Sequence, residues 1–360
     1  MTTRTVRAQL EEAVLPPFVA LLIALVAGDI LILAFGQQPG EVWLTLLRGT
    51  WGNAYGFGQV LYKATTLIFT GLAVSLGVRA GMFNIGAEGQ LAAGGLAAAL
   101  ASMLFPAAAP AILIIAAAMI AAALAGGAVG YVPGVLKARF GAHEVITTIM
   151  LNFIVLGLLN YFIVYRVHVA ETLHTPEVPK ASLTRLADLS TAFHGSAANA
   201  AFLVALVVAL WVGWYLFRTR AGYDLRAVGL QPDAAEYGGV KVGAVWTKAM
   251  TISGAIAGLG GINFVLGYKH YYEEGFASGA GFLGIAVALV GRSHPVGVVL
   301  AALFFATLSQ GGLAINALVP KQMIDVLQGV VILAVAASVP EVRRALQSGR
   351  AALAARSGDA

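Results

Sequence analysis

Apolar stretches long enough to cross a bilayer recur along the whole chain. A membrane-spanning helix needs about 20 apolar residues. A shorter stretch at 280–291 ends in Arg292-Ser293-His294-Pro295, so we expect a half-helix followed by a break. The pattern predicts an all-α, polytopic membrane protein with about ten transmembrane segments, some of them broken. The nine longer stretches are 14–35, 60–78, 88–104, 110–136, 145–165, 199–217, 245–267, 296–314 and 322–339.

Composition supports lipid as the solvent of this chain. Hydrophobic residues make up 59% of the 360 positions and charged residues 11%, whereas soluble domains are about half apolar and a quarter charged. The absence of cysteine excludes disulfides and thiolate metal sites. The net charge of +5 lies mostly in loops between apolar runs, which is typical of membrane topology rather than of nucleic-acid binding.

The distribution of lysine and arginine predicts the orientation. With the N-terminus inside, fifteen of these residues fall on the cytoplasmic side and seven on the outer side, as the positive-inside rule expects. An even number of crossings returns the C-terminus to the cytoplasm. Residues 36–59 and 166–198 are then expected to be outer loops, and 218–244 a long inner loop.

Two blocks of opposite topology indicate an inverted repeat. Residues 60–165 begin outside and 245–339 begin inside, and each block contains four crossings and a glycine-rich interruption, at 81–95 and 275–291. We interpret 1–360 as a single transmembrane domain, in which 1–59 form an N-terminal segment and first span.

Polar residues interrupt the chain where the third apolar stretch enters the bilayer. The segment Gly81–Gln90 contains Asn84, Glu88 and Gln90 among three glycines. A carboxylate near hydrocarbon requires a partner or a wet cavity, and the glycines permit a discontinuous helix. We expect these three side chains to line a substrate pathway; the alternative is a cytoplasmic turn with Glu88 at a helix N-terminus.

A second polar face follows at 144–152. Glu144, Thr148 and Asn152 recur at every fourth position and share one helical face. We add Glu144 and Asn152 to the pathway candidates, and for Thr147 and Thr148 we favour interhelical hydrogen bonds. His143-Glu144 lacks the second histidine of a zinc-peptidase helix, so no metal site is predicted.

The inner loop 218–244 is the strongest candidate for a partner contact. A short helix is expected from Pro232-Asp233, since proline and aspartate suit a helix N-terminus. Ala234, Ala235 and Gly239 would give it a small-residue surface able to lie in a partner's groove. The alternative is a solvated connecting loop.

Asp233-Ala234-Ala235 followed by Gly239 resembles the coupling-helix motif of ATP-binding-cassette (ABC) importer permeases. The segment Gly81–Gln90 more narrowly resembles permeases of nucleoside and simple-sugar uptake systems, and 144–152 and 226–261 fit as well. The resemblance covers roughly 60–335. Sugar and branched-chain amino-acid permeases share this architecture, so the resemblance leaves the cargo open among sugars, branched-chain amino acids and nucleosides. The segment around Glu88 favours nucleosides.

This resemblance implies a multi-pass subunit of a bacterial plasma (inner) membrane importer that works by alternating access. Such a permease pairs with a second, related permease and two ATPase subunits, and it receives substrate from an extracytoplasmic binding lipoprotein. The chain has no phosphate-binding loop of the form GxxxxGK[ST]. We therefore expect no catalytic residue and no bound cofactor here, with ATP and Mg²⁺ held on the partner subunits.

Two other classes of protein remain as alternatives. An ion-coupled secondary transporter also uses inverted repeats and broken helices, and Glu88 and Glu144 would then be ion sites. An intramembrane enzyme is disfavoured because the chain has no GxSxG elbow and no HExxH helix.

Overall fold

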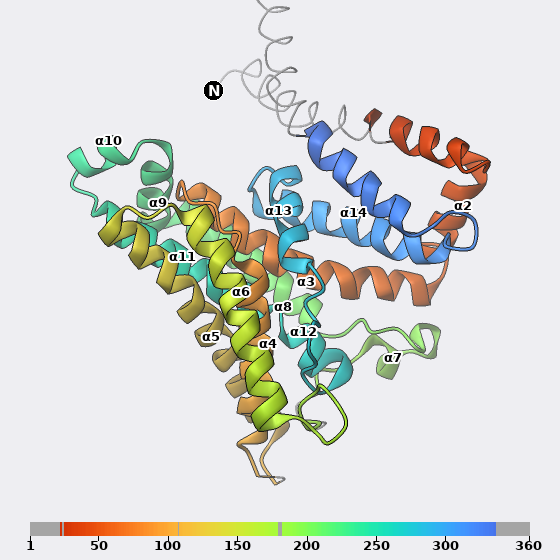
Figure 1. The fold of residues 1–360 in the computed structure, drawn as a ribbon, viewed down its shortest axis with the longest axis horizontal. Helices are drawn as coiled ribbons and strands as arrows, with labels where there is room; N and C mark the ends of the chain where they lie inside the picture. The colour runs from red at the N-terminus through yellow and green to blue at the C-terminus, as the bar shows by residue number, and fades with distance from the viewer. Residues whose placement is uncertain (1–21, 24, 107, 179–181, 336–360) are drawn as a thin grey trace, which may run out of the picture. The chain divides into compact units, whose positions relative to one another are not determined.

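A computed structural model describes residues 22–23, 25–106, 108–178 and 182–335, and these are predominantly helical (Figure 1). Among them, six helices are long and apolar enough to cross a membrane, or seven if one bent pair counts as a single span. The predicted polytopic helical architecture is thus confirmed. The two chain ends, with residues 14–21 of the first predicted span and 336–339 of the last, lie outside the described residues.

The helices occur in the following order. They are α2 (Pro39–Thr50), α3 (Ala54–Arg79), α4 (Ala87–Met103), α5 (Ala111–Phe140), α6 (Glu144–Phe162), the π-helix η1 (Ile163–Val167), α7 (Leu186–Leu189), the 3₁₀-helix η3 (Thr191–Phe193), α8 (Ala201–Arg218), α9 (Arg220–Leu230), α10 (Pro232–Tyr237), α11 (Val242–Leu259), α12 (Ile262–Phe264), the π-helix η4 (Val265–Lys269), α13 (Ala280–Val290) and α14 (Pro295–Ala314). A further apolar helix covers Gln322–Val335.

The expected half-helix at 280–291 is confirmed, since α13 has only 11 residues. The expected outer loop at 36–59 is wrong, because α2 and the first turn of α3 occupy most of it. Glycine, proline and glutamine at 36–40 are typical of loops, so the sequence did not predict this helix. Residues Leu25–Ala34 and α2 form the bent pair, with 112° between them.

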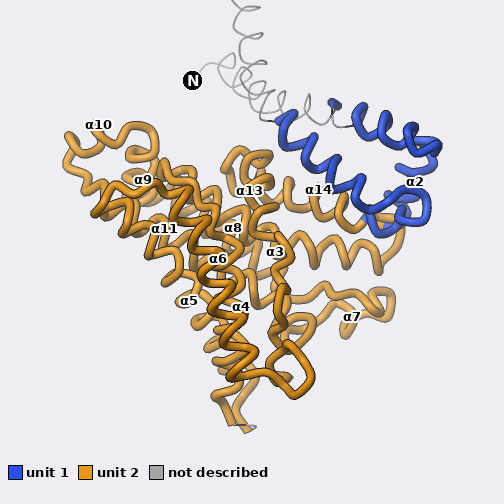
Figure 2. The backbone as a smooth tube through the Cα atoms, in the orientation of Figure 1, with its two compact units in different colours: residues 1–49, 311–360 blue, residues 50–310 orange. Residues whose placement is uncertain are grey.

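The chain forms two compact units (Figure 2). Residues 1–49 and 311–360 make up the first. In its described part, Gly28 packs against the ring of Trp43, and the Trp43 indole donates a 2.7 Å hydrogen bond to Asp29. The side chains of Ile32 and Val42 are buried there.

Residues 50–310 form the second unit, in which α3 is the most buried of the long helices. By contrast, α5, α6 and α8 keep large apolar side chains such as Ile120, Phe153 and Leu210 exposed. Exposed side chains of this kind suit lipid contact, because a hydrocarbon surround carries no penalty for them.

Glycines allow α5 and α11 to pack with their backbones close together. A Cβ added to Gly126 would lie 2.3 Å from the carbonyl oxygen of Gly254, and one added to Gly130 would lie 2.3 Å from that of Met250. Small residues at matched positions are the usual means of close helix approach in membranes.

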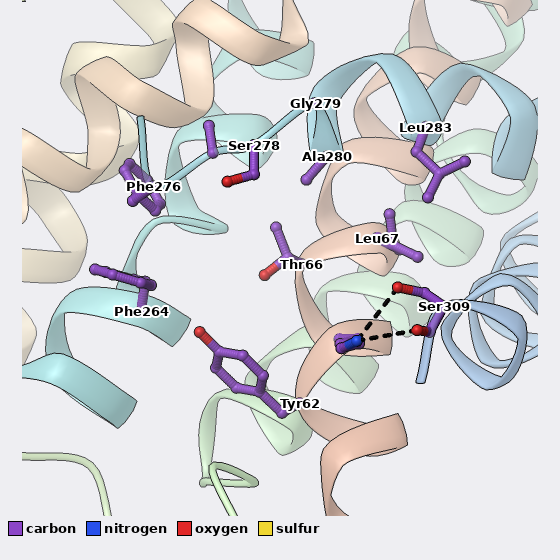
Figure 3. A pocket seen from close by; sticks show the side chains of 12 residues that line it. Tyr62, Thr66, Leu67, Phe264, Phe276, Ser278, Gly279, Ala280, Leu283 and Ser309 are labelled. Atoms are coloured by element: carbon purple, nitrogen blue, oxygen red, sulfur yellow. Dashed lines mark hydrogen bonds between the residues drawn. The ribbon is translucent and has the colours of Figure 1, made fainter. Parts of the chain in front are cut away.

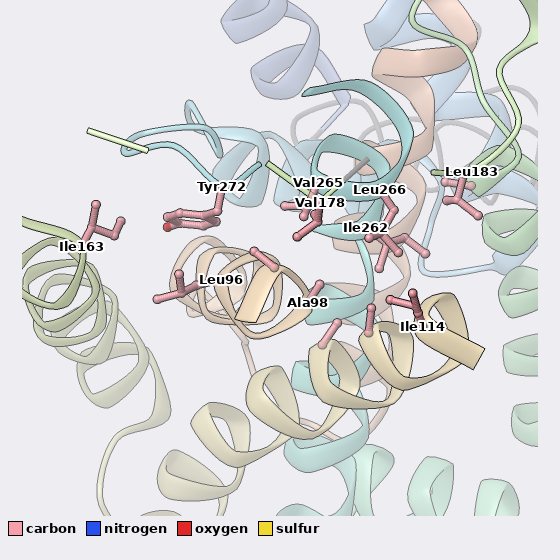
Figure 4. Packing of buried hydrophobic residues seen from close by; sticks show 14 residues of the cluster. Leu96, Ala98, Ile114, Ile163, Val178, Leu183, Ile262, Val265, Leu266 and Tyr272 are labelled. Carbon is pink, nitrogen blue, oxygen red and sulfur yellow. The ribbon is translucent and has the colours of Figure 1, made fainter. Parts of the chain in front are cut away.

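An apolar cluster joins one end of α4 and α5 to the segment that follows α11 (Figure 4). Leu96, Ile114, Ile262 and Tyr272 are all nearly or fully buried in it. This packing fixes α12 and η4, which carry part of the candidate site described below.

Candidate functional site

The segment 80–86 links α3 to α4 as non-helical backbone. Gly81 adopts φ +72°, and an added Cβ there would lie 3.2 Å from the Cα of Gly229 in α9, so glycine is required on both counts. Further on, the backbone N–H of Gly86 donates to the side chain of Asn84 at 2.9 Å. The segment is thus a turn between two separate helices with Glu88 in the first turn of α4, as the alternative interpretation expected, and not a break within one helix.

Asn84 and Gln90 form a closed hydrogen-bond network with α11. The Asn84 amide donates to Gln90 at 2.8 Å and to the hydroxyl of Ser253 at 2.7 Å, and Gln90 donates back to Asn84 at 3.1 Å. Ser253 in turn donates to the carbonyl of Ala73 in α3 at 2.6 Å. The polar side chains of this network are fully buried, so the network satisfies buried polar groups and connects three helices.

Asn152 of α6 holds the same segment from the other side. Its amide donates to the carbonyl of Ile85 at 2.8 Å, and its side-chain oxygen accepts from the backbone N–H of Gly89 at 2.9 Å. The Thr148 hydroxyl accepts from Ile85 N at 3.3 Å and donates to the carbonyl of Glu144 at 2.7 Å. Asn152 thus pairs backbone groups that the turn before α4 and the first turn of α4 leave without partners.

Glu88 joins the beginnings of two helices. It lies in the first turn of α4, and its carboxylate accepts from the backbone N–H groups of Gly279 at 2.8 Å and of Gly281 at 2.6 Å, at the start of α13. Helix N-termini favour negative charge, and hydrogen bonds to a carboxylate are stronger than neutral ones. Glu88 is 6% exposed, and these bonds compensate the cost of its burial.

The length of α13 separates Glu88 from the end of α3. Arg79, at the end of α3, donates to the carbonyl of Ser293 at 2.9 Å, so the turn after α13 lies level with that end of α3. From this turn, α13 extends back by about 16 Å, which is roughly half of a 30 Å hydrocarbon core. The beginning of α13, which Glu88 contacts, therefore lies the full length of this helix away from the turn beside Arg79.

Glu144 lies apart from this network. Its carboxylate forms a 2.8 Å ion pair with Lys137 of α5. The structure therefore brings Asn84, Glu88, Gln90 and Asn152 together around the start of α4, and pairs Glu144 with a neighbouring helix. The pathway-lining role of these residues stays a prediction.

A cavity of about 340 Å³ adjoins this network (Figure 3). Thr66 is 12 residues from the start of α3, about 18 Å along the helix, so the cavity lies beside the middle of α3. None of the five candidates from the sequence lines it. The lining residues are Tyr62, Lys63, Thr66 and Leu67 of α3, Phe264 of α12, the segment Phe276, Ala277, Ser278 and Gly279, Ala280 and Leu283 of α13, and Ser309 of α14.

One wall of the cavity is aromatic. The rings of Phe264 and Phe276 lie 5.0 Å apart between centroids, and Tyr62 packs on Tyr268 at 5.3 Å. In Figure 3 the hydroxyl of Tyr62 points into the space between Phe264 and Thr66. An aromatic wall with a hydroxyl at its edge can stack a flat ring and hydrogen-bond its rim.

The opposite wall carries an amine and hydroxyls. The Lys63 ammonium donates to the carbonyl and hydroxyl oxygens of Ser309, both at 3.3 Å. The Thr66 hydroxyl accepts from Asn263 at 2.9 Å. No carboxylate belongs to this lining, so its charged group is a cation.

Glu88 does not line the cavity but is connected to it by a hydrogen bond to Gly279. The backbone N–H that it binds at Gly279 belongs to the lining, and Thr70 of α3 donates to the carbonyl of Ala280 at 3.1 Å. Sequence reasoning found Glu88 but missed Tyr62, Lys63 and Thr66. The available signal was the polar interruption that these residues make in the apolar stretch 60–78.

The segment 218–244, which we expected to be an inner loop, contains the two helices α9 and α10. Proline begins α10 at Pro232, as expected, and α10 ends at Tyr237. Asp233, Ala234 and Gly239 are exposed, whereas Ala235 is buried within the chain and contributes nothing to the exposed small-residue surface.

Comparisons with known proteins cover nearly the whole chain. It is 38% identical to a guanosine ABC transporter permease of Bacillus subtilis over 90% of this chain and 93% of that one. It is 31% identical to a nucleoside ABC transporter permease of Lactococcus lactis over 90% of each chain, and 33% identical to a glucose ABC transporter permease of Haloferax volcanii over 88% and 85%.

The family match extends over residues 56–336, which is most of the chain. The resemblance to ABC importer permeases noted in the sequence is thereby confirmed. The chain belongs to the family described as the permease component of the branched-chain amino acid transport system.

Proposed function

We propose that this permease moves nucleosides into the cytoplasm as the membrane-spanning subunit of an ABC importer. The observation that carries the choice of cargo is the cavity. Its volume of about 340 Å³ suits one small molecule, and its lining combines aromatic rings with hydroxyls and one amine. A zwitterionic amino acid would need a carboxylate for its ammonium group, and this lining has none.

Likeness to nucleoside permeases supports the same choice. The guanosine and nucleoside permeases match this chain over about nine-tenths of its length and of their own. The glucose permease matches almost as far, so identity alone does not separate a sugar from a nucleoside. The aromatic wall favours the nucleoside, because its base offers a flat π-face that a hexose lacks.

The coupling to ATP is assigned to α9 and α10. The surface of this region exposes Asp233, Ala234 and Gly239, and beside them Tyr237 is 100% exposed and Leu230 85% exposed. Large apolar side chains so exposed on a polar loop suit a partner groove. In this proposal separate ATPase subunits hold ATP and Mg²⁺, a second permease completes the membrane channel, and a binding lipoprotein delivers the nucleoside.

ATP binding to these subunits would move α10 and shift the permease between outward-open and inward-open states. A ligand can shift such an equilibrium only by its differential affinity for the two states. The buried network around Asn84 and Gln90 connects α3, α4 and α11, so these helices would move together rather than separately.

The test is uptake of radiolabelled solutes by cells of the native host, with the chromosomal gene replaced by variants. Guanosine uptake should depend on this gene and on ATP, and excess glucose or leucine should not compete. Uptake of glucose or leucine in place of guanosine would refute the cargo. Guanosine uptake by the purified chain alone, driven by an ion gradient in proteoliposomes, would refute the ABC mechanism in favour of a secondary transporter.

A further inference from the structure

The two walls of the cavity offer different chemistry to a solute. Phe264 and Phe276 present ring surfaces on one side, and Lys63 with Thr66 presents an ammonium and a hydroxyl on the other. The Tyr62 hydroxyl points into the space between them (Figure 3). This arrangement requires a ligand with a flat apolar face and hydrogen-bonding atoms around its edge.

We propose that this cavity is a transit site for the base of the nucleoside, an inference that rests on the proposed function. The base stacks on the wall formed by Phe264 and Phe276, and its edge hydrogen-bonds Tyr62 and the polar wall. Stacking of bases on aromatic side chains tolerates different bases, because each base has a π-face. Such a site is suited to a transporter, which must release its cargo after binding it.

The charge of the lining selects among nucleobase edges. The Lys63 ammonium donates hydrogen bonds and accepts none, and in the cavity wall it contacts the carbonyl and hydroxyl oxygens of Ser309. A base edge rich in acceptors, such as the carbonyl oxygen and ring nitrogen of guanine, complements this wall. A cationic solute does not, because the lining contains no carboxylate.

Glu88 is the positioning residue of this site. Its carboxylate fixes the N–H groups of Gly279 and Gly281, and Gly279 lies in the lining. The backbone is also tight there, because a Cβ added to Gly281 would lie 2.2 Å from the backbone nitrogen of Glu88. Glu88 thus fixes the position of the Gly279 backbone in the cavity lining without contacting the nucleoside.

A single introduced thiol can report occupancy of the cavity. The chain has no cysteine, so Ser278→Cys in the exposed part of the lining creates its only thiol. In membranes that contain the assembled transporter, a maleimide reagent should modify this thiol, and guanosine should slow the reaction while glucose and leucine should not. Ser182→Cys, exposed and outside the lining, should react at a rate that guanosine leaves unchanged.

Substitutions at Phe264 then test the stacking. In the Ser278→Cys background, Phe264→Tyr should keep protection at a similar guanosine concentration. Phe264→Leu keeps an apolar side chain but removes the ring, and should raise the protecting concentration roughly 5- to 150-fold. Phe282→Leu, on a half-exposed ring outside the lining, is the matched control and should change nothing.

The outcomes separate the two proposals. Guanosine uptake without protection of the thiol introduced by Ser278→Cys, or equal protection in the Phe264→Tyr and Phe264→Leu variants, would overturn the transit site and leave the importer intact. A thiol that never reacts would show that another chain or lipid covers the cavity, and would also overturn the site. Absence of guanosine uptake from the unaltered transporter would overturn the proposed function itself.

Discussion

Gly126→Ala should destabilise the packing of α5 on α11, although alanine is the better helix former. The new methyl group would lie 2.3 Å from the carbonyl oxygen of Gly254 and 2.7 Å from the Cα of Gly258. Carbon atoms pack at about 3.5–4.0 Å, so the two helices would have to separate by roughly 1 Å.

The magnitude follows from two opposing contributions. Replacing glycine by alanine inside a helix stabilises it by about 1 kcal/mol. Overpacking of a close interface costs about 1–3 kcal/mol, and here the clash is with backbone atoms that cannot rotate away. The expected net change is a loss of up to about 2 kcal/mol.

Gly157→Ala provides the matched control, because it changes the same residue type in a long apolar helix. Nothing lies within 4 Å of a Cβ at Gly157, which is exposed on α6. Unfolding of the purified chain by sodium dodecyl sulfate in mixed micelles, followed by circular dichroism, should give a lower midpoint for Gly126→Ala and an unchanged or higher midpoint for Gly157→Ala. Equal midpoints for the two variants would refute the close approach of α5 and α11.

The site and the loops give three further predictions. Glu88→Gln keeps one acceptor and turns an amide toward a buried backbone N–H, which should lower the unfolding free energy by about 1–3 kcal/mol in the same titration; an unchanged value would contradict the two hydrogen bonds. Ala234→Asp should abolish guanosine uptake at normal membrane abundance, whereas Ala234→Ser should preserve it. His270 accepts from Arg185, and burial followed by this guanidinium lowers the pKa of His270 below its ordinary 6.5. The His270 imidazole therefore resists protonation in the folded loop, whose stability is complete above pH 6.5 and declines as pH falls below it. Hydrogen-exchange protection factors of 182–189, which correct for the slower intrinsic exchange in acid, should be lower at pH 5 than above pH 6.5, and His270→Gln should remove this pH dependence.

Much of the fold could be predicted from the sequence because lipid imposes a simple pattern. Seven predicted apolar stretches correspond to α3, α4, α5, α6 with η1, α8, α11 with its extension to Lys269, and α14. The half-helix α13 and the proline-initiated α10 were also predictable from local signals. In contrast, α2 was not, since glycine and proline at its start are typical of loops.

The candidate site was predictable only in part. Glu88 and Asn152 are conspicuous because polar residues in apolar stretches are costly. The structure shows what offsets that cost: a backbone N–H at the start of α13 for Glu88, and a backbone carbonyl in the turn before α4 for Asn152. The aromatic wall was not predictable. Phe264 and Phe276 are unremarkable in an apolar sequence, and only the fold brings them opposite Thr66, about 200 residues earlier in the chain.

The short length of α13 has a consequence for how this protein is made. A helix of 11 residues covers about half of the bilayer core, so it cannot enter the membrane as an independent span. Its first N–H groups would be unsatisfied in lipid until Glu88, 191 residues earlier, accepts a hydrogen bond from Gly279. Co-translational insertion must therefore hold this segment at the translocon or at the membrane surface until the first half of the chain has assembled to receive it.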